Sequence, residues 1–493
     1  MSPFPTGKES KRVSRLIVVG AGEAGQSLVR EIVDEGLAVT PVAFLDDKPE
    51  LQGQEICGLP VLGSTADLPE VAKQIRADEI LIAIPSASGT LIRRLVLLCR
   101  RCKLPFKIVP GIRAIIEGDV HFDQVRPVAP EDLLGRESVT FRAGSARELV
   151  AGRRVLVTGA GGSIGSELCR QLLALEPSDL YLLGRGENSL FEIDAELTTQ
   201  AGKTRLHTMI ADIRDGQRLE VLAGRHQPQL ILHAAAHKHV PLMEDNPEEA
   251  VMVNVIGTMN MIRFAHLVDA ERFVLISTDK AVAPGSVMGA TKKVAELLVQ
   301  RIGAESTTTR FLTVRFGNVL GSRGSVVPLF MQRIEAGLPL PITDARMTRY
   351  FMTIKEAVLL VIEAMVLGES GATYILEMGE PIPIIELANN LLALSGYDPH
   401  NGDEGPGIEI TGKRPGERLH ETLVEDDEEV TPSNNPLIKQ ARPRQPRSFD
   451  LDHAVGSLLQ PAVAGDRDGV RQALSTILGH DLSLAADDEE PTR

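Results

Sequence analysis

Two segments of the chain repeat one pattern of apolar and polar positions. The first is RLIVVGAGEAGQSLVREIVDEG (15–36) and the second is RRVLVTGAGGSIGSELCRQLLAL (153–175). In each, a short apolar run ends at glycine, and apolar residues then recur every three to four positions. Such runs are typical of buried strands, and the recurrence that follows is typical of helices. Each segment therefore predicts a strand, a tight glycine turn and a helix.

Further apolar runs follow both segments and predict more strands. Those after the first segment are 39–45, 78–86 and 105–111, and those after the second are 180–183, 206–210, 229–233, 272–277 and 313–316. Strands that alternate with helical patterns predict a parallel sheet covered by helices on both faces. We therefore expect the α/β class, with two Rossmann-like doubly wound parallel-sheet domains and a smaller C-terminal substrate-binding part in the second.

Changes in composition along the chain suggest where the domains end. The cluster EDDEE, the proline-rich RPRQPRSF and the polar end AADDEEPTR all follow residue 424. Segments of this kind bury little apolar surface. We expect a flexible N-terminus (1–13), an N-terminal Rossmann-like nucleotide-binding domain (14–135), a connector (136–152), a catalytic domain (153–424) and a partly mobile C-terminal extension (425–493).

Composition is that of a folded soluble protein, with 43% hydrophobic and 24% charged residues among 493. The formal net charge of −15 disfavours nucleic acid as the main ligand, although amides and arginines still bind phosphate locally. No apolar run approaches the ~18 residues of a membrane span, and no signal peptide is recognisable. Cys99 and Cys102 form a CxxC within an apolar-periodic helix without a second ligand pair, so we expect no metal site.

The second glycine turn predicts a dinucleotide site. Glycines let the backbone approach a pyrophosphate, and the following helix N-terminus supplies amides and a positive dipole. At the next strand ends, Asp212 is placed to receive the adenine amino group, and small alanines let a dinucleotide lie against the backbone. The expected cofactor-binding residues of these two regions are Gly159, Gly162, Ser163, Ile164, Gly165, Asp212, Ile213, Ala234, Ala235 and Ala236.

The choice between NAD and NADP is less defined by the sequence. No ribose-binding acid follows the strand 180–183, where Gly184 and Arg185 stand. An arginine there favours a 2′-phosphate and NADP, whereas Glu187 or Asn188 meeting the ribose hydroxyls would suit NAD. In the first domain, Asp46 lies at the expected position for a ribose-binding acid. That domain either binds a second nucleotide without catalysis, in a regulatory or assembly role, or is an empty structural unit.

The stretch STDKAVAPGSVMGATKK (277–293) carries the candidate acid–base groups. A short-chain dehydrogenase would place a tyrosine four residues before its active-site lysine, but here Met288 precedes Lys292. Thr278, Asp279 and Lys280 follow a predicted strand and could transfer protons instead. The alternative interpretations are a cap or turn for the Thr-Asp-Lys run and a solvent-facing position for Lys292 and Lys293.

A set of motifs in order over residues 158–421 resembles a known family. They are TGAGGSIGSE, HAAAHKHVP, NVIGTMN, STDKAV, MGATKK, RFGNVLGSRGSVVPLF, TDARMTRYF and GKRPGERLHE. The set resembles the extended short-chain dehydrogenase/reductases of bacterial polysaccharide synthesis, and within them the nucleotide-sugar 4,6-dehydratases acting on UDP-N-acetylglucosamine. Larger members usually have a four-helix membrane anchor before the first domain. This chain shows none, and a soluble variant and a part of a longer protein are both open interpretations. Few cysteines and no export signal predict a cytoplasmic protein, or one at the inner face of the membrane, and we expect a homo-oligomer.

The resemblance implies roles for individual residues. A nicotinamide, preferably NAD, takes hydride from sugar C4 and returns it to C6 after water has left. Asp279 would protonate the departing C6 oxygen, and Lys280, when neutral, would remove the C5 proton. Thr278 would hydrogen-bond the C4 oxygen, and Lys292 would hold the nicotinamide ribose. Met288 is native to the larger dehydratases, so the site is expected to be active.

The resemblance also implies a UDP-sugar site. Arginine suits a diphosphate because its planar fork binds phosphate oxygens in pairs. Any one of these charged residues is also compatible with a surface salt bridge, and a nucleotide-sugar epimerase or a non-catalytic nucleotide-sensing protein remain the alternative functions. The expected substrate-binding residues are Lys238, His239, Asn318, Arg323, Arg346, Arg349, Arg414 and Glu417.

Overall fold

The computed structural model describes residues 14–109, 122, 125–134, 143–397, 405–444 and 450–482. They form two compact units, of which the smaller combines Met1–Thr140 with Ala388–Gly407 and the larger combines Phe141–Leu387 with Ile408–Arg493. The expected flexible N-terminus lies outside the described residues.

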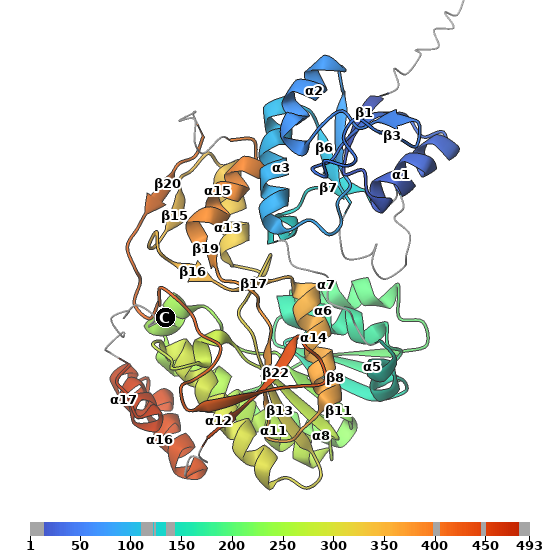
Figure 1. The fold of residues 1–493 in the computed structure, drawn as a ribbon. Helices are drawn as coiled ribbons and strands as arrows, with labels where there is room; N and C mark the ends of the chain where they lie inside the picture. Colours follow the sequence, from blue (N-terminus) through green and yellow to red (C-terminus); the bar gives the residue numbers. More distant parts are fainter. Residues whose placement is uncertain are drawn as a thin grey trace, which may run out of the picture. The chain divides into compact units, whose positions relative to one another are not determined.

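The smaller unit is a doubly wound sheet (Figure 1). Its strand order is β2-β1-β5-β6-β7, and all neighbours are parallel except the last pair. Side chains alternate along the first strand, so Leu16 and Val18 pack with one helix while Ile17 and Val19 pack with the other two. The elements are β1 (Ser14–Val19), α1 (Glu23–Asp34), β2 (Val39–Leu45), α2 (Leu68–Gln74), β5 (Glu79–Ile82), α3 (Gly89–Cys102), β6 (Phe106–Ile108) and β7 (Arg126–Pro127).

The larger unit contains a nine-stranded sheet in the order β10-β9-β8-β11-β12-β13-β18-β22-β21. The first seven strands are parallel, and the last two pairings are antiparallel. The strands are β8 (Arg154–Thr158), β9 (Asp179–Gly184), β10 (Arg205–Ile210), β11 (Leu230–His233), β12 (Arg272–Ile276), β13 (Arg310–Arg315), β18 (Thr373–Leu376), β21 (Glu428–Pro432) and β22 (Ile438–Pro443). The predicted α/β class and Rossmann-like parallel sheets are confirmed.

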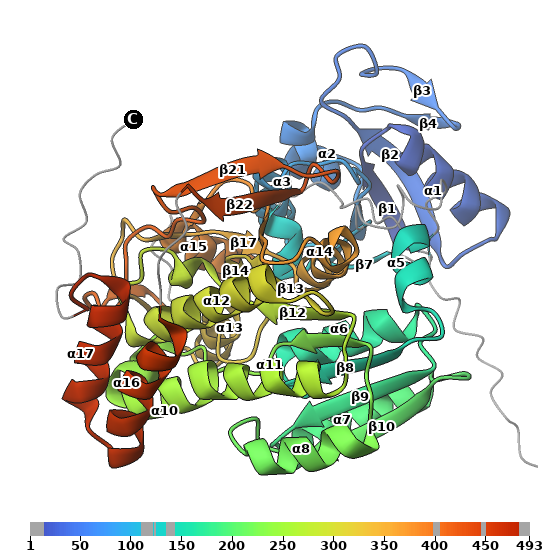
Figure 2. The ribbon, with the colours of Figure 1, turned by 90° about the horizontal axis from the view of Figure 1, so that it is seen from below.

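Helices cover both faces of this sheet (Figure 2). On one face, α8, α10, α11 and α12 contribute to a large apolar cluster with Leu156, Phe273 and Phe311 of the strands. On the other face, α6 and α14 pack together. The helices are α6 (Ser163–Leu173), α7 (Glu187–Thr198), α8 (Gly216–Arg225), α9 (Val240–Asp245), α10 (Pro247–Val251), α11 (Gly257–Leu267), α12 (Val287–Glu305) and α14 (Ile354–Leu367).

A smaller part of the larger unit is built from short strand pairs. They are β14 (Asn318–Val319) with β17 (Phe351–Met352), β15 (Leu340–Ile342) with β20 (Ile408–Ile410), and β16 (Thr348–Arg349) with β19 (Ile382–Pro383). The helix here is α13 (Val326–Glu335), and α15 (Ile384–Leu394) begins here but belongs to the smaller unit from Ala388 onward. This part supplies residues beyond the carboxyl end of the main sheet, where a predicted substrate part would lie.

The chain after residue 424 corrects the predicted C-terminal boundary. Strands β21 and β22 belong to the main sheet, and α16 (Leu451–Ala464) and α17 (Arg467–Leu478) pack on α10 and α12 (Figure 2). Leu458 and Leu474 are fully buried in the core cluster. The described part of this segment is therefore integral to the fold, because its apolar residues complete the core.

Two other boundaries also differ from the prediction. The expected connector contains a helix, α5 (Ala143–Val150), that belongs to the larger unit and packs against α14. Residues 388–407, expected within the catalytic domain, group with the smaller unit, where Leu394 packs against its core. Residues 388–407 lie far in sequence from the rest of the smaller unit, and contacts between such distant apolar residues leave no local pattern in the sequence.

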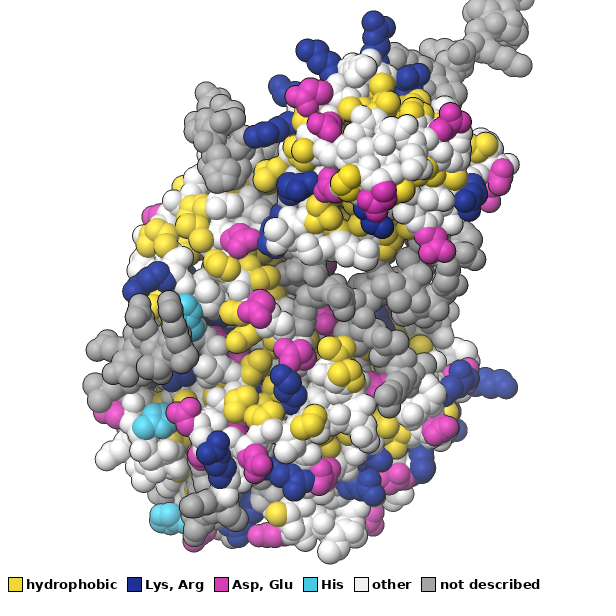
Figure 3. All heavy atoms as spheres, in the orientation of Figure 1, with side chains coloured by type: hydrophobic (Ala, Val, Ile, Leu, Met, Phe, Trp, Pro, Cys, Tyr) yellow, Lys and Arg dark blue, Asp and Glu magenta, His cyan; other side chains and the backbone are white. Residues whose placement is uncertain are grey.

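Two further features are the distribution of charge on the surface and the apolar character of one helical run. On the face drawn in Figure 3, acidic and basic side chains are interspersed. Although we expected no apolar run of membrane-spanning length, one helical run of 21 residues, Pro247–Leu267, is long and apolar enough by composition. In the structure 67% of its apolar window is buried, and many of its residues belong to the core cluster of the larger unit.

Candidate active site

A cavity of about 660 Å³ lies within the larger unit, next to the carboxyl ends of β8, β11, β12 and β13. Most of the residues singled out in the sequence line it, although they come from segments far apart in the chain. Those lining it are Gly159, Gly162, Ser163, Ile164, Gly165, Ala234, Ala236, Lys238, His239, Thr278, Lys280, Met288, Lys292, Asn318, Arg323, Arg349, Arg414 and Glu417. Seven others do not line it, namely Arg185, Asn188, Asp212, Ile213, Ala235, Asp279 and Arg346.

The glycine turn between β8 and α6 has the close packing that a dinucleotide site needs. Gly159 has φ +64°, and a Cβ there would lie 2.8 Å from the Ala235 amide nitrogen. A Cβ on Gly165 would lie 2.1 Å from the Gly159 carbonyl oxygen. The turn therefore excludes side chains and directs the N-terminus of α6 toward the cavity, an arrangement that fits a pyrophosphate.

The residues expected around the adenosine are held by other side chains. Arg214 donates to both carboxylate oxygens of Asp212 at 2.8–3.1 Å, and these hydrogen bonds lower the pKa of Asp212. Arg185 is more than half exposed and lies 3.9 Å from the same carboxylate. In this arrangement Asp212 has an arginine partner in place of a free acceptor, which the sequence did not indicate.

The Thr-Asp-Lys run forms one hydrogen-bonded cluster at the end of β12. Asp279 Oδ1 accepts from the Thr278 hydroxyl at 2.8 Å and from Lys280 Nζ at 3.0 Å. Lys280 Nζ also donates to Asn318 Oδ1 at 3.0 Å. Asp279 is fully buried, so its carboxyl is connected to the cavity through Thr278 and Lys280. Among the described residues, Asp279 Oδ2 has no hydrogen-bond partner.

Thr278 also has the local role that the alternative interpretation proposed. Its hydroxyl accepts from the Lys280 amide and caps the short 3₁₀ turn Asp279–Ala281. The capping function and a place in the cavity wall are therefore compatible in this residue.

Lys292 lies on the buried face of α12, with its amino group at the cavity. Nζ donates to the Ile276 carbonyl oxygen at 2.7 Å, and burial lowers the pKa of Lys292 to about 8. Met288, one helical turn earlier, is 2% exposed and lines the same cavity. Lys292 and Lys293 are each 5% exposed, so the interpretation of these lysines as solvent-facing is wrong.

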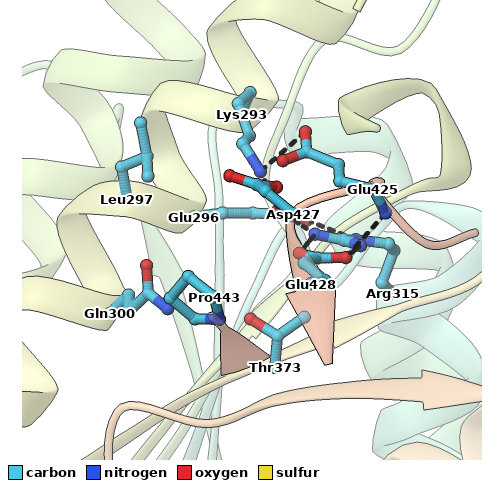
Figure 4. Close-up of a pocket in the computed structure, with 10 residues that line it drawn as sticks. All are labelled: Lys293, Glu296, Leu297, Gln300, Arg315, Thr373, Glu425, Asp427, Glu428 and Pro443. Carbon is cyan, nitrogen blue, oxygen red and sulfur yellow. Dashed lines mark hydrogen bonds and ion pairs between the residues drawn. The ribbon is translucent and has the colours of Figure 1, made fainter. Parts of the chain in front are cut away.

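A buried charge cluster lies beside this helix (Figure 4). Arg315 of β13 pairs with Glu296 of α12 at 2.7 Å and with Glu428 of β21 at 2.9 Å. Glu296 also accepts from the hydroxyl of Ser277 at 2.6 Å, immediately before Thr278. Burial opposes charge on Glu296, but Arg315 keeps the pKa of that carboxyl below its ordinary value. The cluster joins the C-terminal strands to the segment that carries the site.

The basic residues expected to bind UDP differ in whether they line the cavity and in whether another group of the protein already holds them. Arg414 and Lys238 line the cavity, and burial followed by the charge of Lys280 lowers the pKa of Lys238. Arg323 lines it too, but its Nη1 donates to the Gly161 carbonyl at 3.1 Å, across the glycine turn. Arg346 pairs with Asp344 and does not line the cavity, because that exposed ion pair turns it away.

Arg349 lines the cavity, and its guanidinium makes three hydrogen bonds to backbone carbonyls. Nη1 donates to the Leu419 carbonyl at 3.0 Å, and Nη2 donates to the Arg418 carbonyl at 2.8 Å. The side chain is therefore fixed on the segment that follows the predicted UDP motif. Glu421 in that segment lines the cavity and was not predicted, although it ends the quoted motif GKRPGERLHE.

Comparison with known proteins gives matches over both units. Residues 155–443 match the family described as polysaccharide biosynthesis protein, and residues 7–110 match one described as CoA-binding domain. The probable polysaccharide biosynthesis protein EpsC of Bacillus subtilis (strain 168) is 46% identical over 84% of this chain and 69% of its own length.

Two further matches concern the larger unit. A UDP-N-acetylglucosamine 4,6-dehydratase (inverting) of Campylobacter jejuni (serotype O:23/36, strain 81-176) is 34% identical over 56% of this chain and 79% of its own length. The solved structure of Pen from Bacillus thuringiensis is 32% identical, with a TM-score of 0.54 over 59% of this chain and 90% of that one.

The fold and these matches define an extended short-chain dehydrogenase/reductase of the nucleotide-sugar dehydratase and epimerase type. Within this class, the chain belongs to the polysaccharide biosynthesis protein family.

Proposed function

We propose that the protein dehydrates UDP-N-acetylglucosamine to UDP-2-acetamido-2,6-dideoxy-4-keto-hexose, for bacterial polysaccharide or glycan synthesis. One observation carries the proposal: the glycine turn, Lys292, Thr278 and Lys280 all open into one cavity. This brings a dinucleotide site and a proton-transfer set to the same substrate position. The named activity of the related Campylobacter jejuni protein supports the choice of substrate.

The residues of the glycine turn, together with Ala234 and Ala236, would hold a nicotinamide dinucleotide, which we propose is NAD. When bound, this cofactor supplies a hydride acceptor for sugar C4 and a hydride donor for C6. Lys292 would bind the nicotinamide ribose. With its pKa at about 8, most of its charge is present at neutral pH and would stabilise a developing alkoxide at C4.

Proton transfer is assigned to the cluster at the end of β12. Lys280 lines the cavity and would take the C5 proton in its neutral form. Asp279 would supply the proton that leaves with the C6 hydroxyl as water, passed through Thr278 or Lys280 because the carboxyl is buried. The proton of the C4 hydroxyl would pass through Thr278 to the Asp279 carboxylate as C4 is oxidised, and this is the proton that later leaves with the C6 oxygen. Lys280 would return its proton to C5 once C6 has received hydride, so both groups are reset.

On the substrate side, we assign Lys238, His239, Asn318, Arg323, Arg414 and Glu417 to the UDP-sugar. All of them line the cavity. The guanidinium groups suit the diphosphate because they can bind two phosphate oxygens at once. Arg349 is assigned to holding the cavity wall, since its guanidinium makes three hydrogen bonds to backbone carbonyls.

The test is to incubate the purified protein with UDP-N-acetylglucosamine and analyse the product by mass spectrometry. We expect the loss of one water from the sugar nucleotide. A product of unchanged mass, with its 6-hydroxyl retained, would indicate an epimerase. Denaturing the protein should also release NAD, because a cofactor that is regenerated in each cycle need not leave. The proposal would be contradicted if no dehydrated product formed and no dinucleotide were released.

A further inference from the structure

The loop between β14 and α13 lies across the glycine turn of the dinucleotide site, and we call its residues 321–325 the strap. The Arg323 amide donates to the Ser163 hydroxyl oxygen at 3.0 Å, and Arg323 Nη1 donates to the Gly161 carbonyl oxygen at 3.1 Å. Ser163 is the first residue of α6, and Gly161 belongs to the turn before it. Two segments about 160 positions apart are therefore joined directly at the place assigned to the pyrophosphate.

The strap has a defined backbone conformation. The Ser325 amide donates to the Ser322 carbonyl oxygen at 3.0 Å, which closes a β-turn with Arg323 and Gly324 in its central positions. Gly324 has φ +70°, a left-handed conformation that glycine adopts without steric cost. Ser322 is buried, and its hydroxyl accepts from Lys238 Nζ at 3.2 Å. The turn therefore presents Arg323 to α6 from a fixed base.

The contacts that close the strap are few and open to solvent. Besides its bonds to the glycine turn, Arg323 lies 3.5 Å from Glu192 of α7, and both side chains are about two-thirds exposed. Exposed pairs of this kind contribute little to stability, and segments held by a few exposed hydrogen bonds open locally at low cost. The strap is therefore closed over the turn but able to open, which is the property of a gate and not of a fixed wall.

We propose that the strap is the gate of the dinucleotide site: closed over the glycine turn it retains the nicotinamide dinucleotide, and it opens to let the dinucleotide enter or leave. A cofactor that is regenerated in every cycle benefits from such retention, because its loss would interrupt turnover. This role adds to the UDP-sugar contact already assigned to Arg323. It rests on the proposed function only for the presence of a dinucleotide at the turn, and not for the reaction on the sugar.

The test is the kinetics of dinucleotide exchange without any sugar substrate. Chasing bound NADH with excess NAD, followed by fluorescence, gives the dissociation rate constant, and mixing NADH with protein stripped of dinucleotide gives the association rate constant. NADPH and NADP replace them if the protein retains NADP. Gly324→Ala places a Cβ on a residue with φ +70° and 2.6 Å from His239 Cε1, so it destabilises the closed strap. We expect both rate constants to rise, dissociation by about tenfold or more.

Two further variants separate the gate from other effects. Gly337→Ala puts a similar backbone strain, at φ +67°, on a residue that does not line the cavity, with no heavy atom of the described chain within 4 Å of the new Cβ. It should leave both rate constants at their wild-type values. Arg323→Lys keeps the positive charge but loses the guanidinium that bonds Gly161, so both rate constants should rise by a smaller factor. If Gly324→Ala does not fold, Arg323→Lys decides the outcome.

The direction of the two rate constants distinguishes a gate from a simple contact. A gate limits entry and exit alike, whereas a residue that only contacts the bound dinucleotide limits exit alone. Faster dissociation with unchanged or slower association would therefore overturn the proposal, and so would wild-type rate constants in both folded strap variants. If wild type exchanges NADH but forms no dehydrated product from UDP-N-acetylglucosamine, the proposed reaction fails and the gate is judged on the rate constants alone. A protein that binds neither NADH nor NADPH would contradict both.

Amide hydrogen exchange gives a second readout that needs no nucleotide. The peptide covering residues 320–325 should exchange faster in Gly324→Ala than in wild type, because the closed strap protects the Arg323 amide. Gly337→Ala should exchange there like wild type. Equal exchange in Gly324→Ala and wild type would show that the strap is not closed in solution, and the proposal would fail.

Discussion

Lys280 and Asp279 share a hydrogen bond of 3.0 Å, yet Lys280 lines the cavity and Asp279 is fully buried. Substitutions at the two residues should therefore stop the reaction at different steps. Lys280→Ala removes the proposed C5 base but leaves oxidation at C4 possible, so under the proposed function it should stall near the ketone. Asp279→Asn cannot supply the C6 proton. Each should lower turnover by about 10²–10⁴-fold, and deuterium wash-in at C5 should survive better in Asp279→Asn.

Met288→Ala is the control for this pair, because it removes packing next to the same cavity without removing a proton-transfer group. We expect some loss of stability and a much smaller loss of turnover than in either variant. Better wash-in in Lys280→Ala than in Asp279→Asn would mean that the acid and base roles are reversed. A folded but inactive Met288→Ala would assign the methionine a function that the structure does not suggest.

Lys292 gives a prediction about pH at the same scale. Burial lowers its pKa to about 8, so in the folded protein the charged form is disfavoured relative to the unfolded chain, where the pKa is near 10.5. Between these values the unfolded state binds more protons, and this group makes the free energy of unfolding rise with pH. Lys292→Met removes that dependence. Its stability relative to wild type should therefore be greater at pH 7 than at pH 9.5.

Thermal denaturation of both proteins at the two pH values tests this. Lys203→Met, at an exposed lysine, is the control and should show little change in its difference from wild type. A constant difference between Lys292→Met and wild type would contradict the inferred cost of the buried charge. Activity should be lost in Lys292→Met at every pH, since the proposed ribose contact is gone.

At the scale of elements, the two glycine turns differ in what surrounds them. A Cβ on Gly162 would meet the Gly159 carbonyl oxygen at 3.1 Å within its own turn, whereas a Cβ on Gly22 would have no heavy atom within 4 Å. Gly22→Val therefore meets no neighbouring atom of the described chain at its Cβ, whereas Gly162→Val requires the Gly159 carbonyl to shift by a few tenths of an ångström, so circular dichroism should first show that both variants fold. We expect Gly162→Val to abolish turnover by blocking the pyrophosphate, and Gly22→Val to leave the chemical step largely intact. Equal losses of single-turnover rate in two folded variants would refute this division.

The cluster around Arg315 is a second feature of this scale, since it joins β13, α12 and β21. Arg315→Met would leave Glu296 and Glu428 buried without their partner. Removing one member of a buried ion pair typically costs about 3–5 kcal/mol. Urea denaturation should show a loss of this size. Arg442→Met breaks an exposed pair with Glu369 and should cost at most about 1 kcal/mol. Similar losses in both variants would contradict the role of the cluster.

The same elements show what the sequence could and could not predict. The parallel sheet, the glycine turn and the Thr-Asp-Lys run followed from local patterns, because glycine turns and strand ends leave short-range signals. The residues expected to bind UDP followed from the family resemblance. Arg315 and Glu421 did not, since Glu428 and Lys280, with which they pair, lie more than 100 positions away along the chain. Arg346 and Asp212 were misplaced for a related reason: Asp344 and Arg214, two residues away, hold their side chains, and a motif does not reveal such competition.

At the scale of the whole molecule, the main difference from the prediction is the C-terminal segment. Its acidic and proline-rich composition suggested an extension, but β21 and β22 complete the main sheet and α16 and α17 complete its core. Composition averages over a window and does not detect a few apolar residues at helical spacing, such as Val455, Leu458 and Ala462. Those residues decide whether the segment is part of the fold.

A truncation series tests this conclusion. Ending the chain after residue 424 removes Glu428 from Arg315, leaves the edge of β18 unpaired and exposes the core that Leu458 and Leu474 cover. Each of these leucines contributes about 1.5–3 kcal/mol by burial, so the shortened protein should aggregate or unfold. Ending after residue 482 keeps all of these contacts and should leave soluble yield and unfolding temperature close to those of the full chain. A soluble chain 1–424 with the unfolding temperature of the full chain would show that the segment is an extension after all.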